Sequence, residues 1–134
     1  FFLACQGEAL LGDELGIYLD ELAELARYAG LQTLIRCGQS GPMEIRSASL
    51  CYDFAFETIS LALKAEASPL MGWLEAEVGR LTFRFLPGSD PVEWRFSEEL
   101  TAAAAALGGQ IACKDLDDAV GICLTLPLGG ESCG

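Results

Sequence analysis

The sequence predicts an α+β fold, a two-layer sandwich in which helices pack on one face of a mixed, mostly antiparallel β-sheet. Three observations support this prediction. Apolar residues make up 51% of the 134 residues, which is enough to fill the core of one domain. Apolar periodicity predicts the order helix, strand, helix, two strands, helix, two strands. The strict alternation of strand and helix that is typical of a parallel sheet is absent.

The first helix is expected over residues 12–30, where apolar side chains recur every three or four positions, as on the buried face of a helix. These side chains are Leu15, Tyr18, Leu22, Leu25 and Ala29. Asp13 suits the N-cap of this helix, and Gly30 suits the position just after its C-terminus. Residues 31–37, "LQTLIRC", then have the pattern of a strand, and "GQSGPM" has that of a loop.

The second helix is expected over residues 44–65 and is apolar on most of its surface. Its polar remainder lies on one stripe at helical spacing. That stripe holds Asp53, Glu57, Ser60 and Lys64. The dipeptide Ser68-Pro69 ends this segment, because proline disfavours helical backbone at the residue before it. Phe54 and Ile59 of this helix are expected in the core, together with Leu22 and Leu107.

Two strands follow, with Gly79 at the turn between them. The second strand alternates apolar and polar side chains, so one face of it is expected to pack against the helices. Its inward side chains are Leu81, Phe83 and Phe85, and its outward ones include Thr82 and Arg84.

Residues 97–109 predict the third helix. Ser97 suits its N-cap, Glu98 and Glu99 suit the positive end of its dipole, and Gly108 suits the position just after its C-terminus. The segments "QIACK" and "GICLTLPL" then form a strand pair around "DLDDAV". We expect one domain over residues 1–128 and a flexible tail over residues 129–134.

Charge and composition exclude several classes of function. The net charge is −12, with eight basic and twenty acidic residues, so neither nucleic acid nor an anionic membrane is an expected partner. The chain contains no histidine, which rules out a catalytic triad, a phosphoacceptor histidine and imidazole-bound zinc within it. No metal site is expected.

The six cysteines form no CxxC pair, so we expect free thiols in a reducing, cytoplasmic compartment. Cys113 and Cys123 are predicted on adjacent strands. No apolar run reaches the roughly 18 residues of a membrane span. Because the chain begins with Phe1, we expect it to be a piece of a longer protein, with the possibility that it is the cytoplasmic portion of a membrane-anchored sensor.

Two segments carry a resemblance to a known family. "AAAALGGQIACKDLDDAVGICLTLPL", residues 103–128, has a helix, a Leu-Gly-Gly turn, a strand, a turn with glycine and a strand ending in Leu-Pro-Leu. The second segment is "ARYAGLQTLIRC", residues 26–37. In this order the two segments resemble the ATP-binding domain of two-component sensor histidine kinases, in the GHKL superfamily. In that family a segment similar to the second one precedes the helix that contacts the nucleotide. The resemblance covers about residues 10–128 and implies the histidine-kinase ATPase-like form of the sandwich.

The resemblance places "ETISLALKAE" on the N box of the family, which reads approximately E-x-x-x-N-A-x-K-H-A. Glu57 falls on the glutamate that orients the reacting groups, and Lys64 falls on the lysine. Leu61 replaces the asparagine that binds Mg²⁺ in the family, and leucine offers no oxygen ligand. Ala65 replaces the histidine.

The other nucleotide motifs also depart from the family pattern. After the strand that ends at Phe85, "LPGSDP" holds Gly88 and Asp90 in the wrong order for D-x-G-x-G, whose aspartate selects adenine. "PVEWRFSEEL" lacks the glycines that let backbone N–H groups reach phosphate, and Trp94, Arg95 and Phe96 stand there instead. Few residues remain for an ATP lid.

These departures predict an ATPase-type domain of a sensor histidine kinase, or of a histidine-phosphotransfer protein, that is a pseudokinase and serves as a protein-interaction module. No cofactor is then expected, and Glu57 belongs to the solvated stripe. Expected partners are a kinase or a response regulator, with dimerisation through upstream helices as a possibility. Two alternatives stay open. One is a divergent but active kinase that uses Mg-ATP with Glu57 and Asp90, and the other is an unrelated α+β domain that binds a small molecule.

Overall fold

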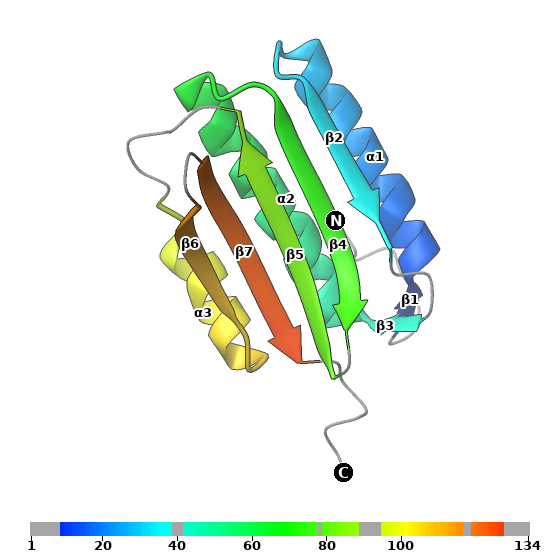
Figure 1. Ribbon diagram of the computed structural model, residues 1–134. Coiled ribbons are helices and arrows are strands. Elements are labelled where there is room, and N and C mark those ends of the chain that lie inside the picture. The colour runs from blue at the N-terminus through cyan, green and yellow to red at the C-terminus, as the bar shows by residue number, and fades with distance from the viewer. Residues whose placement is uncertain (1–8, 39–41, 78, 89–94, 117–118, 128–134) are drawn as a thin grey trace.

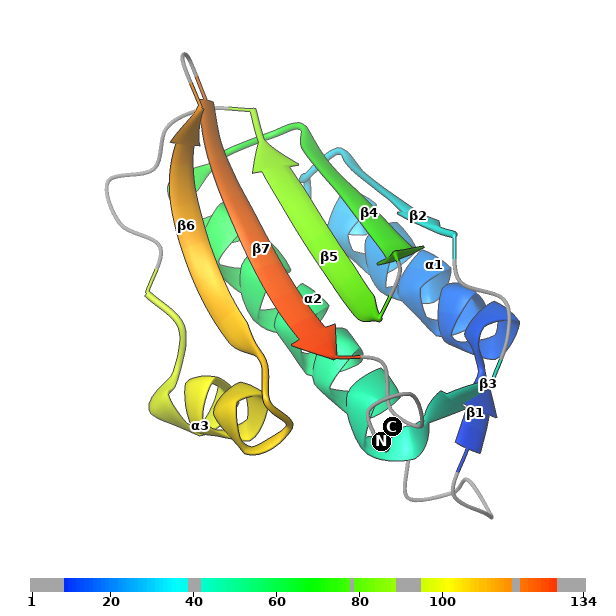
Figure 2. The ribbon, with the colours of Figure 1, turned by 60° about the horizontal axis from the view of Figure 1, so that its bottom comes forward.

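The computed structural model describes residues 9–38, 42–77, 79–88, 95–116 and 119–127 (Figure 1). Within these ranges the chain forms a five-stranded sheet and three helices, α1 (Gly12–Tyr28), α2 (Ile45–Ala65) and α3 (Glu98–Ala106). Figure 2 shows all three helices on the same side of the sheet. The predicted α+β sandwich is therefore confirmed.

The sheet contains β2 (Thr33–Cys37), β4 (Leu70–Glu77), β5 (Arg80–Pro87), β6 (Gln110–Leu116) and β7 (Ala119–Pro127). Its order is β2-β4-β5-β7-β6. Only β2 and β4 run parallel to each other, and the other three pairs are antiparallel, as expected for a mixed, mostly antiparallel sheet.

A small second sheet joins the starts of α1 and α2. It pairs β1 (Ala9–Leu11) with β3 (Pro42–Glu44) in antiparallel register. The expectation that "GQSGPM" is entirely a loop was wrong for its last two residues, which belong to β3. A strand of three residues is too short to show periodicity in the sequence, and it forms here because β1 supplies its hydrogen-bonding partner.

The core lies between the sheet and the helices, and β5 supplies its centre. Leu81, Phe83 and Phe85 are buried, as the alternating pattern of this strand predicts. The ring of Phe54 on α2 lies 5.5 Å from the Phe83 ring and 5.7 Å from the Phe85 ring, measured between centroids. Aromatic pairs at these separations add to the stability gained from burial.

Two of the other predicted core residues are buried, and one is only partly buried. Leu22 and Ile59 are buried, as expected. Leu107 is only partly buried and packs against the edge of the core. The reason is its place at the C-cap of α3, where the chain turns away from the helix layer.

The predicted face of α1 was partly wrong. Leu15 and Leu22 are buried, but Leu25 is 64% exposed and Ala29 is exposed. The side chains that α1 buries are Leu15, Leu19, Leu22, Ala23 and Ala26. This stripe and the predicted one both have helical spacing, so periodicity alone could not choose between them.

The ends of the helices also test the sequence patterns. α1 begins at Gly12, so Asp13 lies inside the helix rather than at its N-cap. Gly30 follows the C-terminus in left-handed backbone, with φ at 100°, as predicted.

Cys113 and Cys123 lie on adjacent strands, as predicted. Cys113 lies opposite Ile122, and Cys123 lies opposite Ala112, so the two cysteines are on adjacent strands. Because successive strand residues point to opposite faces, their side chains diverge across the sheet. Cys37, Cys51, Cys113 and Cys123 are free thiols in the structure. Residues 129–134 lie outside the described residues, and so do Cys5 and Cys133.

Candidate functional site

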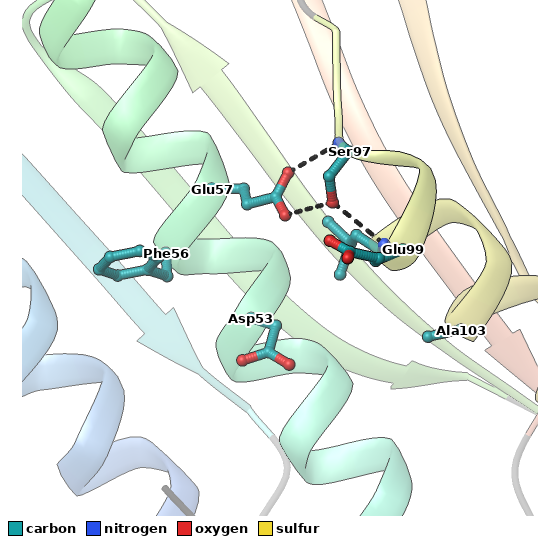
Figure 3. A pocket seen from close by; sticks show the side chains of 7 residues that line it. Asp53, Phe56, Glu57, Ser97, Glu99 and Ala103 are labelled. Atoms are coloured by element: carbon teal, nitrogen blue, oxygen red, sulfur yellow. Dashed lines mark hydrogen bonds between the residues drawn. The ribbon is translucent and has the colours of Figure 1, made fainter.

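Glu57 and Ser97 meet where the middle of α2 approaches the start of α3 (Figure 3). Glu57 Oε1 accepts a hydrogen bond from the backbone N–H of Ser97 at 3.0 Å. Glu57 Oε2 accepts a second hydrogen bond from the Ser97 hydroxyl at 2.6 Å. One carboxylate therefore binds both donors of a residue that lies 40 positions later in the chain.

Ser97 is the N-cap of α3, as its sequence pattern predicts. Its Oγ atom accepts a hydrogen bond from the backbone N–H of Leu100 at 3.1 Å. In a capping box, the third helical residue supplies a carboxylate that reaches back to the N–H of the N-cap. Leu100 occupies that third position and cannot do so, and Glu57 supplies the carboxylate from another helix. The positive end of the α3 dipole is thus occupied by an anion that belongs to the chain.

A cavity of about 230 Å³ opens beside this contact. Its lining is mainly from α2 and α3 and comprises Asp53, Phe56, Glu57, Ser97, Glu99, Leu100 and Ala103. Three of these side chains are carboxylates. Burial raises the pKa of Asp53, and the nearby Glu57 carboxylate raises it further. The walls of the cavity therefore disfavour additional negative charge.

Phe96 lies just before α3 and points into the aromatic core. Its ring stacks on that of Phe54, with centroids 5.5 Å apart and an interplanar angle of 29°. Phe96 is partly buried against the core, whereas Arg95 is exposed. Trp94 lies outside the described residues. Of the described residues before α3, Phe96 thus contributes a ring that packs against Phe54 of α2.

Comparison with known proteins gives a clear result for the fold alone. No family model matches the sequence, and no curated protein matches it. In contrast, the histidine kinase AdeS of Acinetobacter baumannii matches with a TM-score of 0.65 and 11% identity, over 92% of this chain and 68% of that chain. The nucleotide-free catalytic domain of the histidine kinase ThkA matches with a TM-score of 0.62 and 13% identity, over 90% of this chain and 94% of that one.

This chain has the fold of histidine kinase catalytic domains. The blue-light activated histidine kinase EL346 of Erythrobacter litoralis shares it, with a TM-score of 0.67 and 14% identity, over 87% of this chain and 46% of that chain. The fold predicted from the resemblance is therefore confirmed. What this histidine-kinase-like domain binds depends on its own residues.

Leu61 and Lys64 lie one and two turns beyond Glu57 on α2 of the histidine-kinase-like domain. Leu61 is half-buried, and Lys64 is exposed. Neither side chain offers an oxygen atom to Mg²⁺, which takes oxygen ligands almost exclusively. Within the described part of the chain, no group of three or more cysteine or carboxylate side chains is placed to hold a metal ion.

Gly88 has a structural reason to be glycine. A Cβ atom at this position would lie 2.5 Å from both Pro69 Cδ and Ser68 O. Its N–H also donates a hydrogen bond to Ala67 O at 3.0 Å. The glycine thus allows the end of β5 to pack closely against the segment that follows α2. Asp90, the other residue predicted at the adenine site, lies outside the described residues.

Sequence reasoning identified Glu57 and Ser97 separately but missed that they bind each other. Ser97 was recognised from the local pattern of an N-cap, and Glu57 from its place in the N box. No local signal links them, because the hydrogen bonds depend on how α2 and α3 pack. Glu57 is therefore more than a solvent-exposed member of the polar stripe on α2, because it binds the start of α3.

These features decide how well the described residues suit a magnesium nucleotide. Helix N-termini commonly bind phosphate, but Glu57 occupies the N-terminus of α3, and carboxylates line the cavity beside it. Leu61 lacks the oxygen that would hold the cation. The donors and charges described here therefore do not fit Mg-ATP.

Proposed function

We propose that this histidine-kinase-like domain works in two-component signalling as a pseudokinase that does not bind Mg-ATP and acts as a protein-interaction module. The observation that supports this most directly is the pair of hydrogen bonds between Glu57 and Ser97. Helix N-termini in nucleotide sites bind phosphate through their free N–H groups and their dipole. In this chain a carboxylate from α2 takes that place.

Binding of nucleotide would have to displace Glu57 from α3. The displacement would break two hydrogen bonds to a charged acceptor and would leave the carboxylate beside phosphates of the same charge. Leu61 could not anchor the cation that normally screens such repulsion. The net charge of −12 adds a repulsive field, which salt screens.

The proposed role is to bind a kinase or a response regulator in the cytoplasm. A phosphoacceptor histidine would lie elsewhere in the protein, because this chain contains none. That arrangement suits either a sensor kinase or a histidine-phosphotransfer protein, with dimerisation through upstream helices. Residues 1–128 would act as one domain, with residues 129–134 as a tail.

Calorimetric titration with ATP and Mg²⁺ tests the loss of nucleotide binding. We expect no binding tighter than about 100 μM and no rise in melting temperature at millimolar nucleotide. Titration with ATP alone, without Mg²⁺, measures any ATP binding that does not require the cation. A dissociation constant below about 100 μM with Mg²⁺ present would reject the pseudokinase proposal.

One observation favours the alternative, a divergent but active kinase. The cavity beside Glu57 leaves room next to a carboxylate that a reacting group could approach. In that case Glu57→Gln would abolish phosphoryl transfer while ATP binding persists. A parallel loss of binding and transfer would instead indicate that Glu57 only holds α3.

A further inference from the structure

Helices α1 and α2 carry four large apolar side chains that face away from the sheet. Ile17 is 58% exposed, Leu25 64%, Tyr28 85% and Phe56 54%. We call these four residues the outer patch. Among the described residues, they are four of the five large apolar side chains that are exposed, the fifth being Leu34. Such a concentration on one surface is typical of an interaction site.

The geometry of α1 places its part of the patch opposite the core. Ile17 and Tyr28 are eleven residues apart, which is about three helical turns, so they lie on one face. Leu15, Leu19 and Leu22, which are buried against the rest of the protein, lie on the other side of the same helix. The apolar side chains at Ile17 and Tyr28 are therefore not needed to pack α1 against the sheet.

Phe56 belongs to the same surface because α1 and α2 lie side by side and run in the same direction. Both helices begin at the small β1–β3 sheet, and they pack against each other. Figure 3 shows Phe56 pointing away from Glu57 and from α3.

Acidic side chains lie beside the α1 part of the outer patch. Glu21 and Glu24 are exposed and lie within 40° of Ile17 around the axis of α1, at about 100° per residue. Asp20 is also exposed on this helix. The basic residue of α1, Arg27, is engaged elsewhere, because its guanidinium donates a hydrogen bond to Thr33 O. The surface therefore combines apolar contact area with negative charge.

We propose that the outer patch binds a basic amphipathic helix of a partner protein. The apolar face of such a helix would cover the four patch residues, and its lysine and arginine side chains would pair with Glu21 and Glu24. A second copy of this chain is a poorer occupant, since two acidic surfaces repel each other. The proposal rests on the interaction part of the proposed function, and its test uses no nucleotide.

The test uses the full chain and a synthetic 18-residue peptide of leucine and lysine, arranged so that leucine recurs at helical spacing. A peptide of the same composition in scrambled order is the control. Binding is measured by fluorescence anisotropy at 50 and 300 mM salt, and the site is mapped by NMR chemical shifts. We expect the helical peptide to bind at least about tenfold more tightly than the scrambled one and to shift the resonances of Leu25 and Tyr28.

Two double variants separate the apolar and electrostatic contributions. Leu25→Ala with Tyr28→Ala is expected to weaken binding at least about tenfold. Glu21→Gln with Glu24→Gln is expected to weaken it about fivefold and to reduce its dependence on salt. The matched control is Glu75→Gln with Glu98→Gln, which removes two charges from β4 and α3 and should change binding less than about twofold. All variants alter exposed side chains, and circular dichroism checks that they fold.

Three results would overturn the proposal. One is equal binding of the helical and scrambled peptides, which would mean attraction by charge alone. Another is binding that the Leu25 and Tyr28 substitutions leave unchanged. The third is self-association of the chain in sedimentation experiments that Leu25→Ala abolishes, which would make a second copy the occupant. ATP titration of the same samples reports separately on the pseudokinase proposal.

Discussion

Glu57 on α2 binds the backbone N–H and the hydroxyl of Ser97 at the same time, and so it fastens the start of α3 to α2. Buried Leu100 and Ala104 also hold α3 against the core, and α3 contacts β6, so the Glu57–Ser97 pair adds a polar restraint to this apolar packing. This relationship combines two roles. It satisfies a helix N-terminus, and it places a carboxylate at the positive end of the α3 dipole.

Replacing Glu57 with alanine should lower the free energy of unfolding by about 2 kcal/mol. The partly buried N–H and hydroxyl of Ser97 would lose a charged acceptor, and such hydrogen bonds contribute about 1.5–3 kcal/mol each before solvent exposure is considered. Urea denaturation measures the change. Asp53→Asn, in the same cavity, is the control and should not destabilise the protein. A loss below about 0.5 kcal/mol for Glu57→Ala would mean that the contact does not hold α3.

Replacing Ser97 with alanine should cost about 1–2 kcal/mol, because α3 loses its N-cap and Glu57 loses one donor. A double-mutant cycle with Glu57→Ala should give a coupling energy of about 1 kcal/mol. Ser60→Ala is a suitable control, since the Ser60 hydroxyl donates a hydrogen bond to Phe56 O within its own helix. Additive effects of the two substitutions would show that Glu57 and Ser97 stabilise the domain separately.

Asp53 should make stability depend on pH. Its pKa is raised above 3.8, first by burial and then by Glu57, so the native state binds the proton more tightly than the unfolded chain. The stability that comes from protonated Asp53 is therefore fully present below about pH 3.8. It is lost as the pH rises through the raised native pKa, because the native state must then bury part of a charged carboxylate. Asp53→Asn should be more stable than the wild type at pH 7, with a difference that shrinks on acidification.

Urea denaturation at pH 7, 5 and 3.5 checks this dependence. Glu66→Gln, which removes one charge at the exposed C-cap of α2, controls for the change in net charge. An Asp53→Asn variant that gains nothing at pH 7 would contradict the unfavourable placement of the charged carboxylate.

Replacing Phe83 with alanine should cost about 3–5 kcal/mol, because its fully buried ring packs against Phe54 and Phe85. Thr82→Ala, at the next position on the opposite face of β5, should cost less than about 1 kcal/mol. Chemical denaturation of both variants gives the comparison. Similar losses for the two would show that the burial of this strand is not one-sided.

Replacing Gly88 with alanine should destabilise the domain by about 1–3 kcal/mol, since the new methyl group would collide with Ser68 and Pro69. Gly16→Ala is the matched control. Gly16 lies inside α1, and a Cβ atom there would make an ordinary van der Waals contact of 3.5 Å with Cys37. That control should be neutral or slightly stabilising. Thermal denaturation distinguishes the two, and an unaffected Gly88→Ala would argue against the tight packing of this turn.

Several elements could be predicted because their signals are local. The buried face of β5 follows from the alternation around Phe83, and the start of α3 follows from Ser97 before two glutamates. The turn at Gly79 and the left-handed residue at Gly30 follow from the backbone freedom of glycine, with φ at 70° and 100°. Each of these depends on residues within a few positions of one another.

Other features required the packed structure. Leu25 and Leu19 fit helical stripes equally well, and the contact of α1 with α2 and β2 decided that Leu19 is buried. The binding of Ser97 by Glu57 depends on α2 and α3 meeting across 40 positions of sequence, and no periodicity encodes such a distance. Backbone propensities act over one or two turns, whereas side-chain partners on different elements are chosen only when burial of the core brings those elements together.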